Sequence, residues 1–206
     1  MILAIETSGP LCSIGLLDED TEFRAKTNAR FQHAETLNAL IDFMQEVLPL
    51  SRVRSVVIST GPGYFTSLRA GAAAAKALWL ALGVDLFGVN TLFALSQDAQ
   101  EYPVACALDA KKGQVYGAIY RKDKALLEPG IYAWPEFVEK TREIQVRGFA
   151  GAAALEHAAG NMIGPAEPDP ITLARLLQEG KAERLDPEAF EPLYLREPDA
   201  VVNLNK

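Results

Sequence analysis

Residues 53–83 read VRSVVISTGPGYFTSLRAGAAAAKALWLALG, an apolar run followed by a glycine loop and a long alanine-rich stretch. The run at 53–59 is centred on β-branched residues, which is typical of a buried strand. The stretch at 67–82 predicts a helix, and Gly83 is a common kind of residue at the end of a helix. A strand and a helix joined in this way predict an α/β fold with crossover helices.

The segment before residue 53 adds three strands and a helix. The strands are expected at 2–5, 11–17 and 21–27, joined by tight turns. A helix is expected at 34–48, because its apolar residues recur at spacings of three and four and Pro49 ends it. A strand at 85–89 and the start of a helix at 92–97 complete the first half of the chain.

The second half starts the same plan again. Strands are expected at 104–108, 114–120, 124–132 and 144–149, and helices at 135–143, 152–159 and 170–178. Asp169 followed by a proline predicts the start of the last helix. We therefore predict two α/β subdomains, residues 1–100 and 101–206, with a proline-rich tail at 187–194 that packs across the surface.

Composition narrows the class of protein. The chain has 206 residues, of which 49% are hydrophobic, and a formal net charge of -7. This is enough apolar material for one large or two small cores, while the acidic excess argues against tight independent binding of nucleic acid. No apolar run approaches the roughly 20 residues of a membrane span and no targeting segment is visible, so we expect a cytoplasmic protein.

The glycine loop is the first candidate for a binding site. Gly61 and Gly63 connect a strand to a helix N-terminus, where free backbone amides and the helix dipole favour an anion. The alternative is a purely structural turn with Thr66 or Ser67 as the N-cap. The loop is not a Walker motif, because no Lys-Ser/Thr pair follows the glycines.

The ends of two other strands offer further candidates. Glu6, Thr7 and Ser8 follow the first strand, and polar groups at strand ends often face a ligand in open α/β sheets. Asp109 takes the equivalent place in the second half, beside lysines at 111 and 112. The alternatives are a polar strand end and an exposed charged turn.

Metal and disulfide chemistry are not indicated. The two histidines, His33 and His157, do not belong to a group of convergent ligands, so no metal is expected. Cys12 and Cys106 lie in apolar, strand-like stretches and are expected to be free buried thiols. A Ser-His-Asp triad remains open, although no Gly-x-Ser-x-Gly elbow is present.

Four motifs, in chain order, resemble the TsaB/YeaZ family. They are MILAIETS (1–8), GPGYFTSLR (61–69) leading into the alanine-rich helix, LDAKKGQVY (108–116) and PLYLR (192–196). The resemblance implies a fold of the actin, sugar-kinase and heat-shock-ATPase type, with two subdomains around a cleft. The family implies a nucleotide site at the loops described above, comprising Glu6, Thr7, Ser8, Gly61, Gly63 and Asp109.

The resemblance also implies a function. Members of the family help to form N6-threonylcarbamoyladenosine in tRNA, next to the anticodon, as non-catalytic scaffolds or activators of the transferase TsaD, with the ATPase TsaE joining them. ATP or ADP and tRNA would then be bound only at the level of the complex, with no cofactor of the chain's own, and the isolated chain could form a homodimer. TsaD carries a His-x-x-x-His metal site, which here would match His33 and Leu37 and is therefore broken.

Some positions depart from the family pattern. Tyr64, Ser67 and Gln114 stand where serine, glycine and glutamate are common. The second subdomain also lacks the Asp-x-Gly-Gly-Thr loop of an active ATPase, so no catalytic residue is expected. The alternatives are a sugar-kinase-like phosphotransferase, a peptidase, or an ordinary homodimeric structural protein.

The partner interface is expected on the first two helices. Residues 70–77 carry almost no side-chain bulk, so another helix could approach closely, although alanine helices buried within one domain have the same composition. The apolar stripe of the neighbouring helix is wider than its inner face needs, which favours an interface. The residues expected to form it are Leu37, Ile41, Met44, Arg69, Ala70, Ala74 and Ala77.

Overall fold

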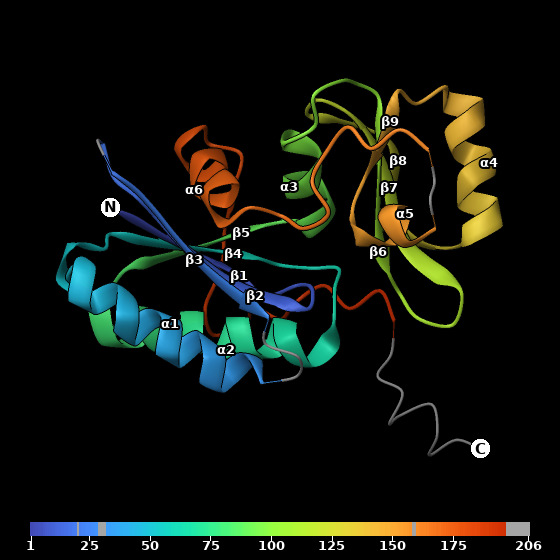
Figure 1. Ribbon diagram of the computed structural model, residues 1–206. Coiled ribbons are helices and arrows are strands. Elements are labelled where there is room, and N and C mark those ends of the chain that lie inside the picture. Colours follow the sequence, from blue (N-terminus) through green and yellow to red (C-terminus); the bar gives the residue numbers. More distant parts are fainter. Residues whose placement is uncertain (20, 29–31, 158–159, 197–206) are drawn as a thin grey trace, which may run out of the picture.

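The computed structural model describes residues 1–19, 21–28, 32–157 and 160–196. These residues form two sheets side by side, each with helices on both faces (Figure 1). The α/β class predicted from the sequence is confirmed. We refer to each sheet, with the helices that cover it, as a subdomain.

The first sheet has the strand order β10-β5-β4-β1-β2-β3. Its central strand β1 runs parallel to β4 and antiparallel to β2. The strands are β1 (Ile2–Glu6), β2 (Leu11–Leu17), β3 (Glu22–Asn28), β4 (Ser55–Ser59), β5 (Asp85–Val89) and β10 (Glu183–Arg184). The helices and the short 3-10 turn of this subdomain are α1 (His33–Val47), η1 (Leu50–Arg52), α2 (Phe65–Leu82) and α6 (Pro170–Gln178).

Apolar residues line both faces of the first sheet because helices cover both. Leu3 and Ile5 of β1 pack in the core between the sheet and helices α1 and α2, while Ala4 faces the opposite way, towards α6. Figure 1 shows α1 and α2 lying side by side under the sheet, with α6 above it. Successive side chains of β1 therefore point to opposite faces of the sheet, as expected for a strand.

The second sheet has the order β8-β7-β6-β9, and α3, α4 and α5 pack on it. Its strands are β6 (Val104–Asp109), β7 (Gln114–Arg121), β8 (Lys124–Ala133) and β9 (Gly148–Ala150). The helices are α3 (Thr91–Gln97), α4 (Trp134–Ile144) and α5 (Ala152–Glu156). The predicted strand at 144–149 is mostly wrong, since α4 extends through Ile144 and the strand has only three residues.

Near its C-terminal end, the chain returns to the first sheet. The boundary between the subdomains therefore differs from the predicted division at residue 100. Helix α6 packs on β1 and β2, and β10 pairs with β5. The tail then crosses the surface beside α2, where the amide of Leu193 donates to the carbonyl of Thr60 at 2.7 Å. The first subdomain is therefore built from both ends of the chain.

Two helix starts test the capping predictions. Asp169 caps α6 as expected, because its side chain accepts from the amide of Ile171 at 2.7 Å. Neither Thr66 nor Ser67 caps α2, which begins at Phe65 with Tyr64 in the cap position. Within the described residues, none of the helices combines the length and apolar character that crossing a membrane requires.

Candidate functional site

The two N-terminal motifs pack directly on one another. We call this region the motif junction: Glu6, Thr7 and Ser8 at the end of β1, with Gly61, Gly63 and Gly71 of the loop and helix that follow β4. The amide of Tyr64 donates to the carbonyl of Ser8 at 2.8 Å. A Cβ atom at position 63 would lie 2.9 Å from the Cα of Ser8, which real Cβ atoms essentially never do. Gly63 therefore lets the loop approach the residue that follows the end of β1.

A third glycine of the junction serves the same purpose. Gly71 lies in α2, and a Cβ atom there would collide with the hydroxyl oxygen of Thr7. Glycine is unfavourable in the middle of a helix relative to alanine by about 1 kcal/mol. Close packing against β1 explains why this helix accepts a glycine among its alanines.

Glu6 is held inside the junction rather than presented to solvent. It is 3% exposed, and its Oε1 accepts from the amide of Ser8 at 2.6 Å and from the Ser8 hydroxyl at 2.5 Å. Burial raises the pKa of Glu6, and the hydrogen bonds from Ser8 only partly oppose this. Oε1 of the carboxyl group thus accepts both donors of Ser8. Oε2 has no hydrogen-bond partner within the usual distance among the described residues, although the Ser59 hydroxyl is close enough to lower the pKa of Glu6.

The loop after β6 is closed by its own side chains. Asp109 accepts from the amide of Lys111 at 2.7 Å through Oδ1, and its Oδ2 pairs with the Lys111 ammonium at 2.6 Å. Lys111 and Lys112 adopt left-handed backbone angles, with φ of 65° and 56°. Asp109 is thus engaged in holding its own turn.

Lys111 also reaches across to the first subdomain. Its ammonium nitrogen lies 3.3 Å from the hydroxyl of Tyr64 and 4.6 Å from the centre of that ring. The contacts to Asp109 and Tyr64 raise the pKa of Lys111. We call this contact, made by Tyr64, Lys111 and Asp109, the latch.

The space between the two loops is small. A cavity of about 40 Å³ lies between Ser8, Gly63 and Tyr64 on one side and Asp109 on the other, with Glu167 also in its wall. Sites for small molecules usually measure about 300–1,000 Å³. The structure brings the two loops predicted to bind a nucleotide close together. Their contacts with one another leave little space between them. Nucleotide binding there stays a prediction.

The histidines do not form a metal site in the described part of the chain. The Nε2 of His33 lies 3.0 Å from the carbonyl oxygen of Gly9, and Leu37, one helical turn later, is fully buried in the core. His157 stacks on Trp134, with ring centres 4.4 Å apart. Among the described residues, no three His, Cys, Asp or Glu side chains are close enough to share a metal ion.

The two cysteines are free and buried, as expected. Burial, with a smaller contribution from the charge of Glu6, raises the pKa of Cys12 to about 12, and burial raises that of Cys106. Neither thiol is activated as a nucleophile.

Part of the predicted partner interface is wrong. Leu37 and Met44 are fully buried and Ile41 is 9% exposed, all three within the core between α1 and the sheet. Their stripe is the inner face of α1, so they cannot contact a partner. Ala74 also packs partly against this core.

A different set of residues on the same helices is exposed. Phe43 is 56% exposed, Val47 52% and Leu80 78%. Arg69, Ala73 and Ala77 are also exposed on α2, and Ala70 is partly so. We call these exposed residues the α1–α2 face. The interface predicted from the sequence did not include Phe43, Ala73 or Leu80, although Ala73, Ala77 and Leu80 follow one another at helical spacing.

Comparisons with known proteins agree with this architecture. A family model described as TsaD: tRNA N6-adenosine threonylcarbamoyltransferase matches residues 27–172, which is more than half of the chain. A protein of Pseudomonas aeruginosa described as similar to peptidase YEAZ has the same fold, with a TM-score of 0.73 and 24% identity over 95% of this chain and 99% of that one.

Several curated proteins are similar along nearly the whole length. An uncharacterized protein of Mycobacterium tuberculosis is 32% identical, over 97% of this chain and 93% of its own. The tRNA threonylcarbamoyladenosine biosynthesis protein TsaB of Escherichia coli is 27% identical, over 95% of this chain and 94% of its own. The TsaB of Bacillus subtilis is 29% identical, over 97% and 95%.

Together, the two packed sheets and the TsaD-type family match define a two-subdomain α/β protein of the TsaD-like class. Within that class, the chain belongs to the TsaB/YeaZ family.

Proposed function

We propose that this chain acts in the biosynthesis of threonylcarbamoyladenosine in tRNA as a non-catalytic partner of the transferase TsaD. The observation that carries the proposal is the α1–α2 face. Soluble proteins rarely leave several large apolar side chains exposed together unless a partner covers them. Leu80 of α2 and Phe43 and Val47 of α1 are each more than half exposed, on helices that contact one another. Phe43 lies towards β3, where its ring centre is 6.1 Å from that of Phe23.

The absence of catalysis is supported by the motif junction. A phosphotransferase of this fold needs room for a nucleotide between its two loops, whereas the cavity here is about 40 Å³. Asp109, the acid best placed for phosphate or metal chemistry, is paired with Lys111. ATP or ADP, the ATPase TsaE and tRNA would therefore enter through the complex, which would form in the cytoplasm.

Flat alanine surface beside the apolar side chains suits a helical partner. Ala73 and Ala77 are exposed and have little bulk, so a helix of the partner can approach the α2 backbone closely. At the edge of this surface, the guanidinium carbon of Arg69 lies 5.3 Å from the centre of the Phe65 ring. This contact holds a positive charge where a partner carboxylate would meet it.

Binding of purified TsaD by a matched pair of variants tests the proposal. Leu80→Asp places a charge on the α1–α2 face, whereas Leu155→Asp places one on α5 of the second subdomain, at a leucine that is 59% exposed. We expect Leu80→Asp to weaken the complex by about 2 kcal/mol or more and Leu155→Asp to leave it unchanged. Equal affinities for TsaD in the two variants would reject the α1–α2 face as the interface.

The same surface suits a second copy of the chain. Sedimentation of the isolated chain distinguishes this case, because Leu80→Asp should convert any homodimer to monomer. If Leu80→Asp abolishes the homodimer but leaves TsaD binding intact, the face serves self-association and not the transferase.

A further inference from the structure

The tail of the chain crosses from the first subdomain to the second. We call residues 190–196 the strap; it begins beside α2 and reaches the turn between β6 and β7. Leu193 and Tyr194 contact the first subdomain, whereas Leu195 packs partly on the core of the second. The strap therefore touches both subdomains through consecutive residues.

The first anchor of the strap is Lys76, in the middle of α2. Its ammonium nitrogen donates to the carbonyl of Phe190 at 2.8 Å and lies 5.9 Å from the centre of that ring. Tyr194 packs on Phe65 at the start of the same helix, with ring centres 4.7 Å apart. A hydrogen bond from a charged donor is stronger than one between neutral groups, so Lys76 fixes the strap on α2.

Between Phe190 and Tyr194 the strap lies on the glycine loop. The amide of Leu193 donates to the carbonyl of Thr60 at 2.7 Å. Gly61 has a φ of 104°, and a Cβ atom there would lie 2.8 Å from the carbonyl oxygen of Leu193, closer than real Cβ atoms come. The first glycine of the loop therefore makes room for the strap, whereas Gly63 makes room for Ser8.

The second anchor is Arg196, which binds the turn after β6. Its Nη1 donates to the carbonyl oxygens of Ala110 and Lys111, and its Nη2 donates to the side-chain oxygen of Gln114 at 2.5 Å. Arg196 is partly buried, whereas the Lys111 side chain of the latch is 59% exposed. Exposed charged contacts contribute little, so Arg196 is the stronger of these two contacts to the turn.

On the other face of the first sheet, α3 joins the two subdomains. Leu92 and Leu95 are fully buried in the core of the second subdomain, and Ala94 is fully buried in the core between the first sheet and α6. Figure 1 shows α3 and α6 above the first sheet, whereas α2, which carries the strap, lies below it. A rotation about α3 would therefore separate the subdomains at the strap and preserve both cores.

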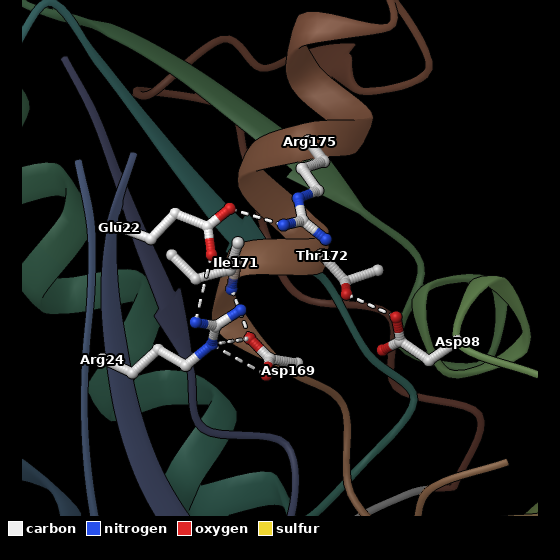
Figure 2. A network of polar contacts seen from close by, with 7 residues as sticks. All are labelled: Glu22, Arg24, Asp98, Asp169, Ile171, Thr172 and Arg175. Carbon is white, nitrogen blue, oxygen red and sulfur yellow. Dashed lines mark hydrogen bonds and ion pairs between the residues drawn. The ribbon is translucent and has the colours of Figure 1, made fainter. Parts of the chain in front are cut away.

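Polar contacts hold the α3 side together (Figure 2). Asp98, at the end of α3, accepts from the hydroxyl of Thr172 on α6 at 2.7 Å. Arg24 of β3 binds Asp169, which caps α6, at 3.0 Å. Neither contact involves the strap, so both can persist when the strap is released.

We propose that the strap is a clasp that keeps the two subdomains in one orientation, and that release of Arg196 lets them open by rotation about α3. In the open state Asp109 would move away from Tyr64, and the cavity of about 40 Å³ between their loops would widen. The anchors Lys76 and Arg196 are not part of the α1–α2 face. Failure of the clasp would therefore leave the proposed partner binding untouched.

Single-molecule energy transfer between dyes on the two subdomains tests the clasp in the full chain. The dyes are attached to Asn38→Cys on α1 and Glu139→Cys on α4, both exposed positions, while Cys12 and Cys106 are buried and should not react. We expect the population with low transfer efficiency to rise about tenfold or more in Arg196→Ala, because hydrogen bonds from a charged group are lost.

Three further variants sharpen the test. Lys76→Met removes the anchor on α2 and should also raise the low-efficiency population. Arg184→Ala removes a guanidinium from the same part of the chain, but its partner Asp85, at 2.6 Å, lies in the first subdomain, so the population should not change. Gln114→Glu in the Lys76→Met background places a carboxylate opposite Arg196 and should lower the population again.

Equal low-efficiency populations in Arg196→Ala and Arg184→Ala would overturn the proposal, and so would a rise in Gln114→Glu. Melting followed by circular dichroism separates opening from unfolding, because an open chain keeps both cores. If Arg196→Ala does not fold, the comparison of Lys76→Met with Arg184→Ala decides, and equal populations in these two would then reject the clasp.

Discussion

The motif junction and the α1–α2 face differ in what is left for a ligand or partner to touch. At the junction, Glu6, Thr7 and Ser8 are at most 3% exposed, and glycines pack against Thr7 and Ser8. On the face, Leu80 is 78% exposed and continues the exposed row of Ala73 and Ala77, which present little bulk. The motifs with polar side chains and glycines are therefore used for internal packing. The alanine-rich helix α2 supplies the exposed surface.

The small residues of α2 explain both outcomes. On its inner side, Gly71 lets the helix approach Thr7 closely, and on its outer side Ala73 and Ala77 leave a flat surface. The same composition thus serves an internal contact on one side of the helix and an external one on the other.

The largest expected effect compares the inner and outer sides of α1, through the free energy of unfolding. Leu37→Ala should lower the free energy of unfolding by about 2–5 kcal/mol, because it opens a cavity in the core beneath α1. Phe43→Ala, on the α1–α2 face, should cost less than about 1 kcal/mol, since the side chain is 56% exposed. Urea unfolding measures both. Similar losses would contradict the assignment of inner and outer sides.

The second prediction concerns Gly71. Gly71→Ala should destabilise the chain by about 1–3 kcal/mol, because the new methyl group collides with the hydroxyl of Thr7. In a Thr7→Ala background the collision is removed, and the same substitution should become neutral or stabilising by up to about 1 kcal/mol, since alanine favours a helix. A double-mutant cycle by thermal unfolding measures the coupling. Additive effects would show that the junction is not packed as tightly as the structure indicates.

The sequence predicted much of the fold because the elements have strong local signals. The helix after the glycine loop, the cap at Asp169 and the three opening strands were all recognisable from spacing and turn residues. The return of the chain to the first sheet was not, because β10 has two residues, Glu183 and Arg184, and is fixed only by pairing with β5.

The candidate site was harder to predict than the fold. The sequence pattern predicted that Glu6, Gly63 and Asp109 lie at the ends of strands. Whether their loops bind a ligand or contact one another depends on distances in space between segments far apart in the sequence. Likewise, the apolar stripe of α1 was visible in the sequence, whereas its inward direction follows from packing on the sheet. Leu80 does not belong to an apolar stripe of this kind, so the sequence did not predict it as an interface residue.

The third prediction compares the pH dependence of the two regions. The pKa of Glu167, beside the junction, is about 7, which is above the usual value for an unfolded glutamate, about 4.3. The folded state therefore binds this proton more tightly, and its stability should fall as the pH rises from about 4.5 to about 7. Glu167→Gln should remove that loss and stabilise the chain by about 1–2 kcal/mol at pH 8, with no gain at pH 4.

Melting curves across this pH range provide the check for Glu167→Gln. Leu80→Ala is the control from the α1–α2 face, and its effect on melting should not vary with pH in the same way. A pH-independent effect of Glu167→Gln would show that the carboxyl is not held protonated near neutrality.

The smallest expected effect concerns the latch. Lys111→Met removes the ion pair with Asp109 and the contact with Tyr64, but the lysine side chain is 59% exposed, so the loss of stability should be less than about 1 kcal/mol. The variant should also fail to bind ATP, because the packing of Gly63 on the Ser8 backbone, and not the latch, leaves only about 40 Å³ between the loops. Titration with a fluorescent ATP analogue, with and without magnesium, measures this directly. If Lys111→Met gains ATP binding while the wild-type chain has none, the latch is what closes the cleft, and the junction would be a shielded nucleotide site instead of a filled one.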